Sequence, residues 1–112
     1  GQFFVTSSSR RFKHDIVDYN KGLAELMQMQ PKYFVYNDEP NQKQRAGFIA
    51  EDFDEAGLTE YVVYSEDENG AMVPEGIQYE KLCVGLQTVA VKQQQTIESL
   101  IARIEALEAK VQ

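Results

Sequence analysis

A serine and a lysine lie close together near the start of the chain, in the segment Ser8 to Lys13 (SSRRFK). A serine hydroxyl becomes a good nucleophile only when a base removes its proton. A lysine amine is such a base only when desolvation or neighbouring cations lower its pKa. Arg10 and Arg11 place positive charge beside this lysine, which favours the neutral amine. The segment therefore permits nucleophilic chemistry, although an exposed serine-rich linker followed by a solvated basic patch explains the same residues.

Three other groups of polar residues suggest chemistry less strongly. His14, the single histidine, follows Lys13 and is either an alternative base for Ser8 or a surface residue. The acidic residues of 51–55 are better explained as a solvated helix face than as paired catalytic carboxylates, because no cleft partner is identifiable. The segment 65–76 resembles a calcium loop, but its twelfth position is Gly rather than Glu, so a hairpin turn is favoured. We therefore expect no metal site and no cofactor.

Length, charge and cysteine content restrict the classes of protein to which the chain can belong. The 112 residues match a single domain, and 11 basic against 18 acidic side chains give a net charge of −7, which disfavours a nucleic-acid partner. No apolar run is long enough to cross a membrane, and a single cysteine cannot form an intrachain disulfide. Because the chain begins Gly-Gln-Phe-Phe without an initiator Met, we expect it to be a piece of a longer protein.

Short helices and strands are predicted for the first two thirds of the chain. Apolar spacing predicts a helix over 23–29 that Pro31 ends, and a second helix over 51–56 that is closed by Gly57 in a left-handed conformation. Asn69-Gly70 is typical of a type I′ hairpin turn, within a loop of two or more residues. Runs of aromatic and β-branched residues predict strands over 3–5, 33–36, 45–50, 61–64 and 72–73.

The last part of the chain, 79–112, is predicted to be one long helix. Apolar residues recur there at alternating spacings of three and four, the pattern of positions a and d in a coiled-coil heptad. These residues are Ile97, Leu100, Ile104, Leu107 and Val111. In the same frame Cys83 falls at a and is expected to be a packed thiol, while Gln93 places a polar residue at d. Arg103 at g and Glu108 at the next e have opposite charges, which is consistent with a parallel assembly.

Two interpretations of this helix remain open. It either packs along its own domain or associates with other copies, and association is favoured because nothing later in the sequence can cover a narrow apolar stripe. Ile at a with Leu at d favours dimers by propensity, so the pattern does not fix the number of chains. The expected fold class is α+β: a small mixed domain of short strands and helices, followed by a long C-terminal helix that resembles a coiled coil.

Four blocks of the sequence resemble the peptidase S74 family, the C-terminal intramolecular chaperone domains of phage tail spikes, tail fibres and endosialidases. Ser8, Arg11 and Lys13 match the Ser-Asp-x-Arg-x-Lys signature that opens the domain in that family. The blocks that follow in the family's order are 23–36 (LAELMQMQPKYFVY), 47–52 (GFIAED) and 76–82 (GIQYEKL). The resemblance covers 8–112, which is nearly the whole chain.

The resemblance implies a homotrimer that aligns the β-structured stalk preceding it in the same polypeptide and then cuts itself off. It assigns 1–7 to the end of that stalk and 8–112 to the chaperone domain. Carried over residue by residue, Ser8 is the nucleophile, Lys13 is the general base, and the scissile bond joins Ser7 to Ser8. The expected location is a tail fibre or tail spike precursor that is assembled in the host cytoplasm.

Ser9 and Arg11 are expected to support this pair, but the chain departs from the signature at Ser9, where the family has Asp. A carboxylate there could orient Lys13 and Arg11, whereas a hydroxyl lacks the charge. The alternative is therefore a trimerisation module of a fibre protein that has lost cleavage and has no enzymatic activity. Less favoured are a coiled-coil adaptor without a chaperone role and a hydrolase that acts on other proteins. Membrane-tethered eukaryotic transcription factors have the same signature, so the sequence leaves a phage or a eukaryotic origin open.

Overall fold

The computed structural model describes residues 8–111, and every element except the last is short. In chain order the elements are the 3₁₀ helix η1 (Arg10–Phe12), α1 (Leu23–Met27), β1 (Lys32–Phe34), β2 (Arg45–Gly47), α2 (Ala50–Glu55), the 3₁₀ helix η2 (Thr59–Tyr61), β3 (Val62–Glu66), β4 (Met72–Ile77) and α3 (Tyr79–Val111). The expected α+β class and the long C-terminal helix are confirmed. The strand predicted over 3–5 lies outside the described residues.

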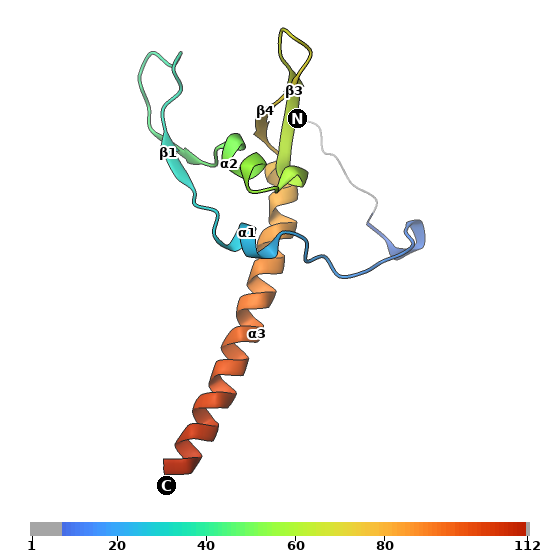
Figure 1. Cartoon of the computed structure of the whole chain (residues 1–112), viewed down its shortest axis with the longest axis vertical. Coiled ribbons are helices and arrows are strands. Elements are labelled where there is room, and N and C mark those ends of the chain that lie inside the picture. Colours follow the sequence, from blue (N-terminus) through green and yellow to red (C-terminus); the bar gives the residue numbers. More distant parts are fainter. Residues whose placement is uncertain (1–7, 112) are drawn as a thin grey trace.

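The short elements form a body around the N-terminal end of α3, and the C-terminal half of that helix projects from the body alone (Figure 1). The chain extends over 68 × 43 × 32 Å with a radius of gyration of 20.0 Å, whereas a compact domain of this length would have about 13 Å. The segment before α1 also leaves the body, and it places η1 to one side of α3 (Figure 1). Both extensions expose side chains that a compact domain would bury.

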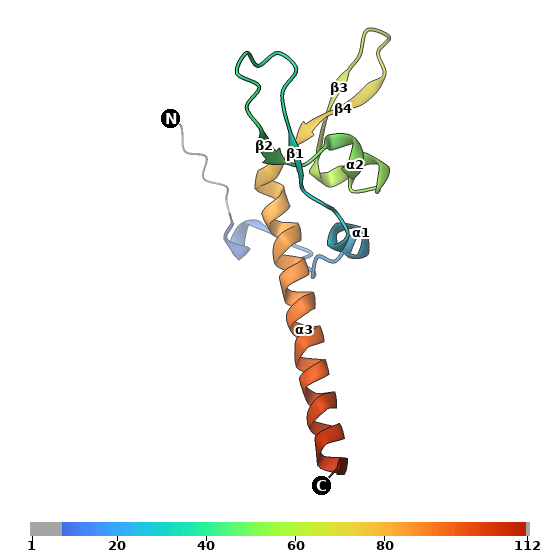
Figure 2. The same cartoon turned by 90° about the vertical axis from the view of Figure 1, so that its left-hand side faces the viewer.

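The strands form two separate antiparallel hairpins rather than one sheet (Figure 2). In the first, Tyr33 of β1 lies opposite Ala46 of β2, and in the second, Ser65 of β3 lies opposite Val73 of β4. An isolated two-stranded hairpin is only marginally stable in water, so helices must supply the remaining stability. For the second hairpin α2 does so, since it contacts both β3 and β4.

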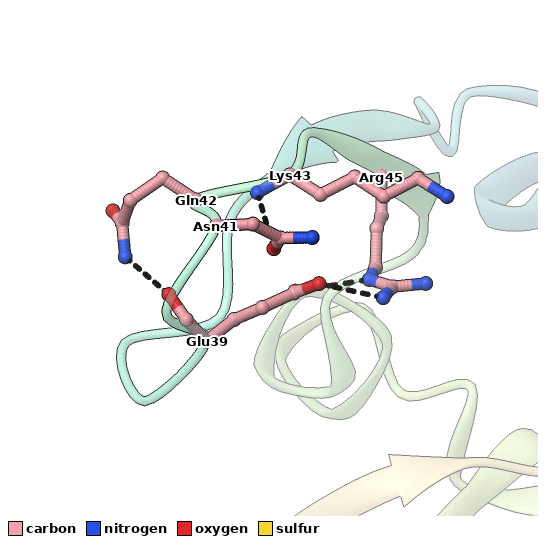
Figure 3. A network of polar contacts seen from close by, with 5 residues as sticks. All are labelled: Glu39, Asn41, Gln42, Lys43 and Arg45. Atoms are coloured by element: carbon pink, nitrogen blue, oxygen red, sulfur yellow. Dashed lines mark hydrogen bonds and ion pairs between the residues drawn. The ribbon is translucent and has the colours of Figure 1, made fainter.

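An ion pair shapes the loop that joins β1 to β2. Arg45, the first residue of β2, donates hydrogen bonds to both carboxylate oxygens of Glu39, at 2.8 and 3.2 Å (Figure 3). Its guanidinium thereby lowers the pKa of Glu39. Nearby, the side-chain amide of Gln42 donates to the backbone carbonyl of Glu39 at 2.7 Å. These contacts are exposed, so they define the path of the loop more than they stabilise the domain.

One small apolar core lies between α1, α2, η2 and the first turns of α3. Its buried residues are Leu26, Ala50, Phe53, Leu58, Tyr61, Val62 and Leu82. Phe53 is fully buried and meets the rings of Phe48 and Tyr61 edge to face, with ring centroids 5.2 and 6.0 Å apart. Such pairs add to the energy of burial, so Phe53 is the central residue of the core.

Helix α3 lies close against the body at Gly85. A Cβ at this position would lie 2.6 Å from Leu26 Cδ2 and 2.6 Å from the hydroxyl oxygen of Tyr61. Both partners are buried core side chains, so a larger residue would force α3 away from the body. The first turns of α3 are thus packed on the body, and the predicted seam farther along the helix is exposed.

Several local predictions are confirmed and others are too long. Helix α1 ends before Pro31, and Gly57 follows α2 with a φ of 78°, as expected. The strand predicted over 33–36 ends at Phe34. The one predicted over 45–50 is also shorter, because its last residue, Ala50, begins α2.

The prediction for the second hairpin is wrong in turn type and confirmed in allowing a longer loop. The turn is not type I′, because only Gly70 in it has a positive φ. It is a longer loop in which the Asp67 carboxylate accepts hydrogen bonds from the N–H groups of Asn69 and Ala71, both at 2.9 Å. The packed thiol expected at Cys83 stays a prediction, because Cys83 is exposed in the single chain and only other copies could cover position a.

Phe53→Ala should lower the free energy of unfolding by about 3–5 kcal/mol, because it leaves a cavity at the centre of a small core. Phe12→Ala is the matched control, since Phe12 is 62% exposed, and it should change the same quantity by less than about 0.5 kcal/mol. Denaturant unfolding followed by circular dichroism measures both. Equal losses for the two variants would contradict the core described above.

Candidate functional site

Residues 8–18, called the arm below, run outside the body, and all their side chains are exposed. The arm is tied to the core by the residues that follow it. The Tyr19 hydroxyl lies 2.8 Å from the Tyr61 hydroxyl and donates to the Glu60 carboxylate at 3.0 Å, and Lys21 pairs with the same carboxylate at 3.1 Å. Desolvation, followed by these hydrogen bonds, raises the pKa of Tyr19, whereas Lys21 and then Tyr19 lower the pKa of Glu60. The arm therefore starts from a fixed point beside α3.

The turn η1 brings the expected nucleophile and base together. The N–H groups of Phe12 and Lys13 donate to the carbonyls of Ser9 and Arg10, both at 3.1 Å. Across this turn Lys13 Nζ donates to Ser8 Oγ at 3.5 Å. A base must come within about 2.6–3.2 Å of the group it deprotonates, and such contacts are often longer before the reactive complex forms. The two side chains are thus within reach of each other, without yet having the reactive geometry.

Ser9 caps this turn. Its side-chain oxygen accepts a hydrogen bond from the N–H of Arg11 at 3.4 Å, and its φ and ψ of −67° and 139° are typical of an N-cap residue. Asp makes the same cap, because its side chain also places an oxygen near that N–H. Ser9 can therefore replace the signature's Asp in shaping the turn, although it supplies no charge. The Arg11 guanidinium lies over the ring of Phe12, 4.5 Å from its centre.

The other candidate residues lie elsewhere or have other partners. His14 Nδ1 lies 2.9 Å from the Asp15 carboxylate, and both side chains are exposed, which agrees with a surface role for the histidine. In the acidic run 51–55, Asp54 accepts a hydrogen bond from the Tyr64 hydroxyl at 2.5 Å and so helps to pack α2 on β3. No group of three potential metal ligands occurs among residues 8–111. Ser7, whose carbonyl would be attacked, lies outside the described residues.

Water reaches both members of the pair in the single chain. Ser8 and Lys13 are exposed, and so are all their neighbours in the arm. A lysine amine loses its proton more readily when it is removed from water. A single chain therefore brings Lys13 close to Ser8 but leaves both side chains in water. Another surface would have to cover Lys13 to desolvate its amine.

No sequence pattern predicted the anchor that holds the base of the arm. Tyr19 and Tyr61 are 42 residues apart, and neither belongs to a periodic apolar pattern that would indicate their contact. Only the packing of η2 against the first turns of α3 brings the second tyrosine to the base of the arm. An aromatic residue directly after a polar segment was the one available signal, and it is a weak one.

Among the described helices, none combines the length and the hydrophobicity needed to span a bilayer. Residues 8–63 match the family described as peptidase S74, chaperone of endosialidase. The match begins at the serine of the Ser8–Lys13 pair and extends through the body into β3. No curated protein matches the chain.

Ser9→Ala should loosen η1, because the N–H of Arg11 loses its acceptor. An N-cap of this kind contributes about 1 kcal/mol, so amide hydrogen exchange at Arg11, measured by NMR, should become up to about fivefold faster. Ser9→Asp is the matched variant and should keep the exchange as slow as in the original chain. Identical rates in all three proteins would show that Ser9 does not cap the turn.

Proposed function

Since this chain belongs to the peptidase S74 family, the chaperones of endosialidase, we propose that it is the intramolecular chaperone domain of a phage tail fibre or tail spike protein. The family description supports the chaperone role and the phage tail context. In the proposed role, three copies associate through α3 and hold the preceding stalk segments of the same polypeptides in register. They are then released by a cut between Ser7 and Ser8. The precursor would assemble in the host cytoplasm.

The exposed apolar seam of α3 is the observation that best supports association. The body buries only Leu82 and Gly85 of this helix. About half or more of each seam side chain stays in water in the single chain: Ile97, Leu100, Ile104, Leu107 and Val111. A continuous exposed row of large apolar side chains is uncommon in a monomer and is typical of an interaction surface. Other copies of α3, with the same seam, are the partners that a heptad pattern provides.

Association of this domain would solve a folding problem of the stalk. Strands that pair between long chains must first close large loops, and the entropy of closure opposes this step before any contact forms. A trimer of α3 fixes three stalk ends close together, which raises their effective concentration and sets their alignment. Cutting afterwards would leave the stalk kinetically trapped, because the aligning unit is no longer joined to it.

The proposed cut follows from the Ser8–Lys13 pair. Ser8 Oγ attacks the carbonyl carbon of Ser7 while Lys13, as a neutral amine, accepts the hydroxyl proton. The bond between that carbon and the Ser8 nitrogen then breaks, and Lys13 returns the proton to the departing amine. Water hydrolyses the resulting ester and restores the hydroxyl. Because the attack is intramolecular, proximity accounts for much of its rate.

Assembly and cutting would be coupled through the exposed arm. Lys13 needs a dry environment to act as a base, and its own chain leaves it in water. Neighbouring chains, or the stalk that they hold, would cover the arm only after the trimer has formed. Such a requirement would prevent the chaperone from leaving before the stalk is aligned.

A trimerisation module without cleavage is the second candidate function. Two observations favour it: Ser9 supplies no charge where the signature has Asp, and the Ser8–Lys13 contact is long at 3.5 Å. Association through α3 is the same in both candidates, so only the fate of the Ser7–Ser8 bond distinguishes them.

Self-cleavage should be visible when the chain is produced with an upstream tag and analysed on a denaturing gel. Ser8→Ala and Lys13→Ala should each reduce the shortened product by at least about 100-fold, which is the typical contribution of a nucleophile's base. Lys13→Arg should be equally inactive, because arginine keeps its proton. His14→Ala is the control that should still cut. An uncut tagged protein that sediments as a trimer would instead establish the second candidate.

Cys83 should report the orientation of the helices. In a parallel trimer the three Cys83 side chains lie at the same level of the coil, so mild oxidation should link two of them and leave the third chain free. An antiparallel pairing centred on Ile104 would separate the cysteines by about 60 Å at 1.5 Å per residue. A non-reducing gel therefore distinguishes the two arrangements, with Cys83→Ser as the control. Sedimentation at micromolar concentration should give three chains, and a folded monomer would contradict the proposal.

A further inference from the structure

Helix α3 presents different faces to its own body and to solvent. In the heptad frame of the seam, the residues packed on the body are Leu82 at g, Gly85 at c and Val89 at g. The core of the body therefore packs on the g/c side of the helix, and the segment that enters α1 at Leu23 reaches round to its b side. The seam itself, at a and d, faces neither the body nor the opposite side.

The opposite side of α3 borders an open groove whose lining mixes apolar and polar side chains. Val84 and Val91, both at position b, are 51% and 46% exposed. Together with Gln87 at e, they face the segment that leads from Tyr19 to Leu23, and the space between is open. We call this surface, formed by Leu23, Val84, Gln87 and Val91, the side groove. Because these apolar side chains lie outside positions a and d, a coiled coil formed through the seam would leave them exposed.

The geometry of a parallel coil determines what lies over the side groove. In such a coil the g side of each helix faces the e side of the next helix around the axis. Because the core of every body packs on the g/c side of its own α3, that body must approach the e/b side of the neighbouring copy. The side groove is on that e/b side. A body element of a second copy is thus its natural occupant.

Helix α1 is the body element best suited to this contact. It contacts α3 of its own chain, and both views place it beside the N-terminal half of that helix (Figures 1 and 2). It also exposes an apolar side chain, Met27, to 44%. Methionine is flexible and fills irregular apolar surfaces well. Glu25 on α1 is exposed and acidic and can pair with Lys92, a basic residue of the groove lining, which also contains Asp18.

We infer that in the assembled protein α1 of each copy docks into the side groove of the next copy, with Met27 against Val84 and Val91. The contact joins two different surfaces, and a threefold arrangement closes it into a ring. The contact would couple the folding of the body to association. It would also fix the position of each body relative to the coil. This inference rests on the parallel trimer proposed above and adds a second interface to it.

Disulfide trapping tests the contact in the full chain. In a Cys83→Ser background, Met27→Cys combined with Val84→Cys should give covalently closed trimers on a non-reducing gel after mild oxidation, since each chain then bonds to both neighbours. Each single-cysteine variant should give no trimer band. Met27→Cys with Glu98→Cys is the matched control, because Glu98 is also at b and exposed but lies two turns beyond Val91, where no body reaches.

Val91→Glu provides an independent measurement that does not depend on cysteine chemistry. It should raise the concentration at which the trimer half-dissociates by at least tenfold in sedimentation, while Glu98→Ala should leave it unchanged. A stable parallel trimer that shows neither the covalent ring nor the effect of Val91→Glu would overturn the docking of α1 and leave the proposed function intact. A chain that remains a folded monomer would overturn both.

Discussion

Tyr61 contacts three parts of the chain that must act together. Its ring packs on Phe53 in the core, its hydroxyl meets the α3 backbone at Gly85, and the same hydroxyl lies 2.8 Å from that of Tyr19 at the base of the arm. Through this one buried side chain the body holds the base of the arm, at Tyr19, beside the first turns of α3. Packing therefore positions the base of the arm, whereas residues 8–18 extend from that point into solvent.

The exposed apolar surface of α3 favours association between copies of the chain. Only seven of the residues 8–111 form the buried core, and much of the apolar area lies instead on a helix that the body of the same chain cannot reach. Burying that area between copies would release about 25 cal/mol for each Å² removed from water. Association is therefore expected to supply much of the stability of the folded domain. Such coupling suits a domain whose proposed task is to bring three chains into alignment.

The arm illustrates how a site can have the right residues without the right environment. The cap from Ser9 and the turn η1 place Lys13 beside Ser8 by local hydrogen bonds alone. Local bonds cannot exclude water, and exclusion of water is what allows a lysine amine to lose its own proton and so accept one from the serine. A single chain places Lys13 near Ser8, and neighbouring chains would exclude the water. Cutting would therefore depend on assembly.

The sequence by itself determined the features that arise from local periodicity and local backbone geometry. The heptad spacing from Ile97 to Val111, the left-handed Gly57 and the Ser8–Lys13 spacing could all be read because each depends on residues a few positions apart. The turn type predicted at Asn69-Gly70 was wrong, because the Asp67 side chain accepts hydrogen bonds from the backbone of this loop. Only the tertiary structure decided which side of α3 the body occupies, how Tyr19 anchors the arm, and that the strands form two hairpins. Those outcomes depend on contacts between residues far apart in the chain, and their energies become defined only when the core around Phe53 has packed.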